Sequence, residues 1–126
     1  MELTVGQALQ QGVEAHNIGN LQEAERFYQA ILQSQPKHPD ANHNLGLIAI
    51  SVNQIEAALP LFKIALDVNP NIEQFWVSYI DALVKAKRVK DAQKVITKAK
   101  DKGLDAEKLG TLLSQLKGVP DSKVPS

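Results

Sequence analysis

The sequence contains an internal repeat, which constrains its fold more than any other feature. When the chain is aligned with a copy of itself so that Ala24 stands opposite Ala58, other residues of the same kind also coincide. Small residues and turn-forming residues both recur at that offset. The small set is Ala24, Ala58 and Ala92, and the turn set is Gly19, Asn53 and Lys87. We therefore divide the chain into three copies, over residues 5–38, 39–72 and 73–106.

Each copy has the pattern of two helices. In the second copy, apolar residues recur at steps of three and four from Ala41 to Val52, which is typical of one buried helical face. A second such stripe begins at Ile55 and stops at Asn69-Pro70, because proline disfavours helix in the residue before it. The turn inside each copy needs one residue with positive φ. Glycine adopts this conformation freely, whereas Lys87 should lose about 1 kcal/mol there.

The small residues predict close approaches between helices, at the three alanines and at Gly12 and Gly46. A further helix is expected over residues 105–117, where four leucines form a stripe that would cap the last repeat. The segment 118–126 is typical of an unstructured tail or linker, which suggests a native protein that continues past Ser126. About seven helices are expected in all.

The spacing of these residues resembles the tetratricopeptide repeat, a helix–turn–helix unit of about 34 residues. The second copy matches that pattern best, through Leu45, Gly46, Ala58, Phe62, Ala65 and Pro70. The resemblance implies an all-α fold, an α-solenoid of three repeats and a capping helix wound into a right-handed superhelix. It also implies a scaffold that binds a protein or peptide in a concave groove. The amino-acid sequence of the repeats is similar to that of bacterial modules that often precede a transferase domain, such as a glycosyltransferase.

In this family the first helix of each pair lines the groove. By register, the groove residues here are Leu9, Val13, His16, Asn17, His43, Asn44, Leu47, Ile50, Val77, Asp81 and Val84. Several of them are aliphatic, and exposed apolar patches mark interaction sites. An error of one residue in helical phase would instead place some of them in the core. Of the positions that clamp a C-terminal carboxylate in some family members, only Asn44 agrees, so that ligand is rejected.

Nothing in the sequence indicates catalysis. The chain has no cysteine, and its three histidines form no metal-binding pattern on one helix. No glycine-rich phosphate loop is present. We therefore expect no enzymatic activity, no metal and no cofactor. A basic leader with an apolar run is absent, as is any apolar run long enough to span a bilayer, so a cytoplasmic protein without membrane contact is expected.

The charge is balanced but unevenly placed. Residues 1–84 carry three basic and nine acidic side chains, whereas residues 85–102 carry eight and two. Lys90, Lys94, Lys98 and Lys102 step by four through the basic segment. This stripe is either a solvated outer face, helped by a Lys87–Asp91 pair, or a site for phosphate or an acidic partner. Nucleic acid is the less favoured ligand, because no aromatic residue is interleaved.

The leading hypothesis from the sequence is a scaffold that binds a protein or peptide segment. Two alternatives stay open. The charge asymmetry would permit head-to-tail self-association into a homo-oligomer. The repeats could also be the N-terminal recruiting module of a larger transferase.

Overall fold

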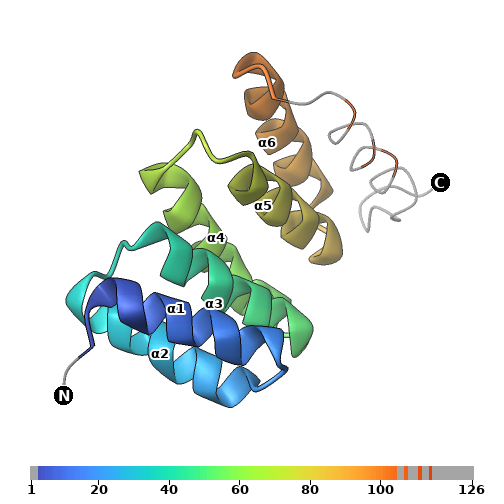
Figure 1. Ribbon diagram of the computed structural model, residues 1–126. Coiled ribbons are helices and arrows are strands. Elements are labelled where there is room, and N and C mark those ends of the chain that lie inside the picture. Colours follow the sequence, from blue (N-terminus) through green and yellow to red (C-terminus); the bar gives the residue numbers. More distant parts are fainter. Residues whose placement is uncertain (1–2, 105–106, 108–110, 112–113, 115–126) are drawn as a thin grey trace. The chain divides into compact units, whose positions relative to one another are not determined.

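A computed structural model describes residues 3–104 and the positions 107, 111 and 114. Residues 3–104 form six α-helices and no strand, which confirms the all-α fold of helix pairs (Figure 1). The helices are α1 (Val5–Asn17), α2 (Leu21–Ser34), α3 (Pro39–Ser51), α4 (Ile55–Val68), α5 (Glu73–Lys85) and α6 (Val89–Asp101). The predicted capping helix over 105–117, apart from three positions, and the tail over 118–126 lie outside the described residues.

The chain divides into two compact units, Met1–Asn69 and Pro70–Ser126. In the first unit α1 packs against α2, α2 against α3, and α3 against α4. In the second unit α5 packs against α6. Each helix pair corresponds to one copy of the sequence repeat.

The turn within each pair has the backbone conformation predicted from the sequence. Gly19, Asn53 and Lys87 have φ of 83°, 63° and 61°. In each turn the next amide N–H donates to a carbonyl five residues earlier, at 2.9 Å for Asn20 and Arg88 and 2.8 Å for Gln54. This bond satisfies a carbonyl that would otherwise be unpaired at the helix end. One left-handed residue thus ends the first helix and turns the chain into the second.

Close packing explains the small residues. Ala24, Ala58 and Ala92 are fully buried. A Cβ atom on Gly12 would lie 2.6 Å from Tyr28 Cε1, and a Cβ atom on Gly46 would lie 2.5 Å from Phe62 Cε1. Aromatic rings of the second helices therefore lie directly on the glycines of the first helices.

The third copy has a different pair of residues at these positions. Ile80 stands at the register position of Gly46, and Ile96 stands at that of Phe62. Both isoleucines are buried, with exposed fractions of 0% and 2%. The larger side chain on the first helix is thus matched by a smaller one on the second.

The loops that precede α3 and α5 are held by one equivalent hydrogen bond. Asn42 Nδ2 donates to the Pro36 carbonyl oxygen at 3.1 Å, and Trp76 Nε1 donates to the Pro70 carbonyl oxygen at 2.8 Å. The two donors stand at equivalent positions of the repeat, and so do the two acceptors. Asn42 also donates to the His38 carbonyl oxygen at 2.9 Å. An asparagine and a tryptophan therefore donate the same stabilising hydrogen bond to the loop in two different copies.

Candidate functional site

In the first unit the predicted groove residues lie on α1 and α3, at positions related by the repeat. Leu9 and Val13 on α1 are half-buried, as is Ile50 on α3. Leu47, the repeat equivalent of Val13, is 37% exposed. Leu9 also packs against the core cluster that α1, α2 and α3 share. Asn17, at the end of α1, is exposed. Apolar side chains thus stay partly open to solvent on both first helices, at equivalent positions in the case of Val13 and Leu47. We call Leu9, Val13, Leu47 and Ile50 the first-helix face.

A polar network joins these helices through the interior. The Tyr28 side chain is fully buried in α2, and its hydroxyl lies 3.3 Å from Nδ1 of His16 on α1. The same side chain is hydrogen-bonded to Asn44 on α3. Asn44 Oδ1 in turn lies 3.4 Å from Nδ1 of His43. His16 and Asn44, two predicted groove residues, are therefore held by a tyrosine between them.

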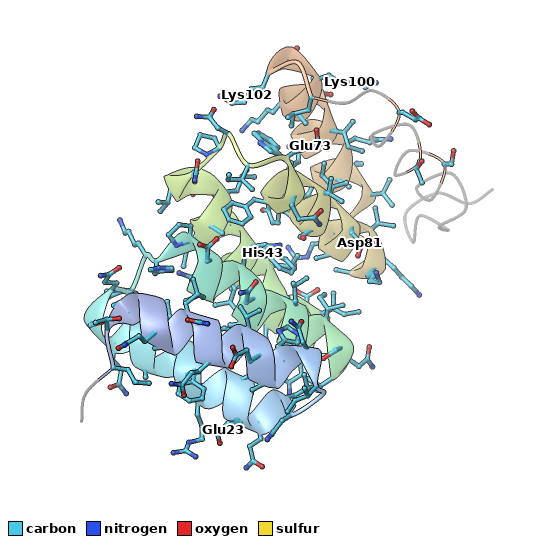
Figure 2. All side chains as sticks on the ribbon, viewed as in Figure 1. Glu23, His43, Glu73, Asp81, Lys100 and Lys102 are labelled. Carbon is cyan, nitrogen blue, oxygen red and sulfur yellow. The ribbon has the colours of Figure 1, made fainter. Side chains whose placement is uncertain are left out.

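His43 belongs to this interior network rather than to an open surface. Only 6% of it is exposed, and its ring centroid lies 5.4 Å from that of Phe62 on α4. His43 is labelled in Figure 2. Burial lowers the pKa of His43, while the hydrogen bond to Asn44 and the charge of Asp40 oppose that shift. The neutral imidazole is thus the form that the folded chain favours at neutral pH. Burial likewise raises the pKa of Tyr28, and its bond to Asn44 acts in the opposite direction.

The second unit carries the remaining predicted residues on α5. Val77 and Asp81 are half-buried, and Lys85 Nζ donates a hydrogen bond to Asp81 Oδ2 across one helical turn. Val84 is 6% exposed and contributes to packing. On α5, the predicted groove residues with an open surface are therefore Val77 and the charge-paired Asp81, which is labelled in Figure 2.

Two features of the first unit were not predicted from the sequence. Tyr28 stands at the repeat position of Phe62, and its role as a hydrogen-bonding centre was not predicted. The signal available was the hydroxyl itself, present in one copy and absent from the next. The other feature is a cavity of about 610 Å³, lined by apolar side chains that include Val5, Phe27 and Ile31. An ion pair between Arg26 and Glu23, 3.2 Å from Nη1 to Oε2, lies at the same cavity.

In the described part of the chain, no three His, Asp or Glu side chains come close enough together to hold a metal ion. None of the helices described has the length and apolar character needed to cross a membrane.

Helix pairs in the register of the repeat, with a left-handed residue inside each pair and glycines under aromatic rings, define a helical repeat protein. The family model for the tetratricopeptide repeat matches residues 39–72, which are the second copy. The second copy therefore matches a tetratricopeptide repeat, and the chain has the fold of such repeats.

Solved structures support this assignment at the level of the fold. The tetratricopeptide-repeat domain of Sgt2 from Aspergillus fumigatus superposes with a TM-score of 0.75 and 19% identity, covering 90% of this chain and 77% of that one. MamA from Desulfovibrio magneticus RS-1 superposes with a TM-score of 0.69 and 16% identity, covering 95% and 77%. No curated protein matches the sequence.

Proposed function

We propose that the chain is a protein-interaction module, and that the first unit binds a peptide or protein segment at the first-helix face. The observation that carries this proposal is the partly open apolar surface on α1 and α3, above all the 37% exposure of Leu47 at the position equivalent to Val13. A fully solvated helix face would place polar residues there. Single exposed apolar side chains are common, but neighbouring ones on one face mark interaction sites, because a partner that covers them removes them from water.

The polar groups beside this face favour a neutral segment over a charged one. Gln10 and Asn17 on α1 carry amides that are open to solvent and can donate to and accept from a peptide backbone. Leu9 and Val13 occupy the positions where a carboxylate clamp would place its first polar and cationic groups. An anionic end group seated against these two aliphatic side chains would lose its hydration without gaining a counter-charge. The expected ligand is therefore a segment of moderate apolarity, bound by side-chain burial and by backbone hydrogen bonds.

The network below the face supports binding without contacting the ligand. Tyr28, which is hydrogen-bonded to His16 on one side and to Asn44 on the other, fixes α1 and α3 relative to each other. A pre-organised face binds with less loss of conformational entropy. On the second unit, we propose Val77 and Asp81 of α5 as a further contact region of the same kind, with Val84 supporting them from the buried side.

A matched pair of variants tests the proposal. Peptides are first selected against the immobilised chain from a random peptide library, and their affinities are then measured for the variants. Leu47→Glu places a charge on the first-helix face, whereas Val68→Glu changes a residue that is 45% exposed at the end of α4, outside that face. We expect Leu47→Glu to weaken the selected peptides about tenfold or more, and Val68→Glu to leave them within about twofold. Equal binding to both variants, or no enriched peptide, would contradict the proposal.

The alternative of head-to-tail self-association is disfavoured by one comparison between copies. Ala41 and Ile48 of α3 are buried, with exposed fractions of 0% and 3%, in the cluster shared with α2. Their repeat equivalents on α1 are Gln7 and Glu14, both exposed. A second copy stacked on that side of α1 would have to bury a carboxylate. We therefore expect a monomer by light scattering at low ionic strength, and a concentration-dependent mass would favour the oligomer instead. If the chain is instead the recruiting module of a larger transferase, the same first-helix face would bind the recruited segment.

A further inference from the structure

Four lysines follow one another at steps of four through α6 and its C-cap, and their position is not needed for the packing of that helix. The stripe consists of Lys90, Lys94, Lys98 and Lys102, all of them exposed. Residues four apart are neighbours on a helix, about 6 Å apart along its axis and about 40° apart around it, so the lysine stripe extends over about 18 Å and winds about a third of the way around the helix. The residues of α6 that serve the core are instead Ala92, Ile96 and Ala99, with exposed fractions of 0%, 2% and 0%.

The two other second helices show that this fold does not require lysine at these positions. By the register of the repeat, α2 carries Gln22, Arg26, Ala30 and Ser34 there, and α4 carries Glu56, Pro60, Ile64 and Val68. Those eight residues include one cation, and the helices that carry them pack within the same kind of pair. The solvent-exposed side of a second helix therefore does not need lysine at these positions. The architecture does not account for four lysines in one row on α6.

Two local explanations also fail. The helix dipole would favour Lys98 and Lys102 near the end of α6, but it disfavours Lys90, which is the second residue of the helix. The ion pair expected between Lys87 and Asp91 is not formed within the described part of the chain, because Lys87 lies in the turn before α6 and has a φ of 61°. Nor does any ion pair among the described residues involve a member of the stripe.

We propose that the lysine stripe binds an acidic helical segment of a partner protein. Carboxylates repeated every four residues on such a helix have the same axial spacing as the lysines, so several ion pairs can form in one register. Each exposed pair is weak alone, and a row of them gives orientation and a fast association rate. This surface belongs to α6 and is separate from the first-helix face.

The chemistry of α6 distinguishes this ligand from other polyanions. The exposed residues beside the stripe include Gln93 and Thr97, and no aromatic residue of α6 is available for stacking on bases. The stripe also lacks arginine, whose planar fork binds phosphates with two hydrogen bonds. The apolar side of α6 is buried, so it cannot insert into a lipid surface. The helix itself carries Asp91 and Asp101, exposed carboxylates that oppose a uniformly anionic surface.

The probe is a fluorescein-labelled helical peptide of about 16 residues, long enough to cover the stripe, with glutamate at every fourth position. A second peptide of the same composition has its glutamates distributed around the helix. Lys94→Gln/Lys98→Gln removes two charges from the stripe, and Lys37→Gln/Lys63→Gln removes two charges from the first unit. Circular dichroism checks that both variants fold, which is expected because glutamine is a good helix former.

Fluorescence anisotropy should show the periodic peptide binding at least about fivefold more weakly to the stripe variant, and within about twofold to the control variant. Its affinity should fall about tenfold or more between about 50 and about 300 mM salt. The proposal is overturned if the two peptides bind equally, if the two variants lose affinity equally, or if the periodic peptide does not bind. It is also overturned if poly-uridylate or vesicles containing phosphatidylserine bind through the stripe more tightly than the peptide does.

Discussion

Replacing Gly46 by alanine tests whether the close approach of α3 and α4 is the reason for glycine at that position. The added Cβ would lie 2.5, 2.8 and 3.0 Å from three ring atoms of Phe62. The Phe62 side chain is 1% exposed and cannot rotate into solvent. To accept the methyl group, either the ring or the backbone of one helix must therefore move.

The expected effect is the difference between two opposing contributions. Alanine is favoured over glycine within a helix by about 0.5–1 kcal/mol. Overpacking a buried site costs about 1–3 kcal/mol. We expect Gly46→Ala to lower the free energy of unfolding by about 1–2 kcal/mol, the part of the overpacking cost that the helix preference of alanine does not offset.

Gly6→Ala is the matched control, because its added Cβ would meet only Thr4 Oγ1, at 3.9 Å. It should leave stability unchanged or raise it by up to about 1 kcal/mol. Urea unfolding followed by circular dichroism measures both variants. Adding Phe62→Ile, which places the second-helix residue of the third repeat at this position, should make Gly46→Ala less destabilising than it is alone. If Gly46→Ala is as stable as the Gly6→Ala control, the ring is not fixed and the close-packing argument is wrong.

Three further outcomes are expected from the structure. Lys87→Gly should raise the free energy of unfolding by up to about 1 kcal/mol, because glycine has no penalty at φ 61°, and Lys87→Ala should not; urea unfolding measures both. The free energy of unfolding should fall as the pH drops below about 6.5, the usual histidine pKa, because the histidine of the unfolded chain then binds a proton while the buried His43, with its lowered pKa, does not. Urea unfolding from pH 8 to about pH 5 measures this, and the free energy of unfolding should depend less on pH for His43→Gln. Asn42→Ala should cost about 1–3 kcal/mol by leaving the Pro36 and His38 carbonyls without their donor, and hydrogen exchange should show less protection at the start of α3.

Periodicity in the sequence was enough to predict the helix pairs, because their causes are local or repeated. Apolar spacing marks the buried side of each helix, and proline marks its end. The positive φ of Asn53 and Lys87 follows from their alignment with Gly19, since each copy must turn at the same point. The close packing at Gly46 was predicted in the same way, although the atoms that it contacts were not.

The candidate site was predicted less completely, because burial of a side chain depends on what packs over it. His43 and Leu47 are one helical turn apart and were assigned to one surface, yet their exposed fractions are 6% and 37%. Phe62 from α4 lies against His43, and its position is a property of the helix pair rather than of the local sequence.

Hydrogen bonds between distant residues required the tertiary structure altogether. Tyr28 on α2 joins His16 on the preceding helix to Asn44 on the following one. Asn42 and Trp76 look unrelated as residue types, but both donate to the carbonyl of an equivalent proline. A repeat pattern records which positions are apolar, small or turn-forming. The hydrogen-bond partner of a polar side chain depends instead on which donor and acceptor come together when the helices pack. For this reason the fold could be predicted from the sequence, whereas the interior hydrogen-bond network could not.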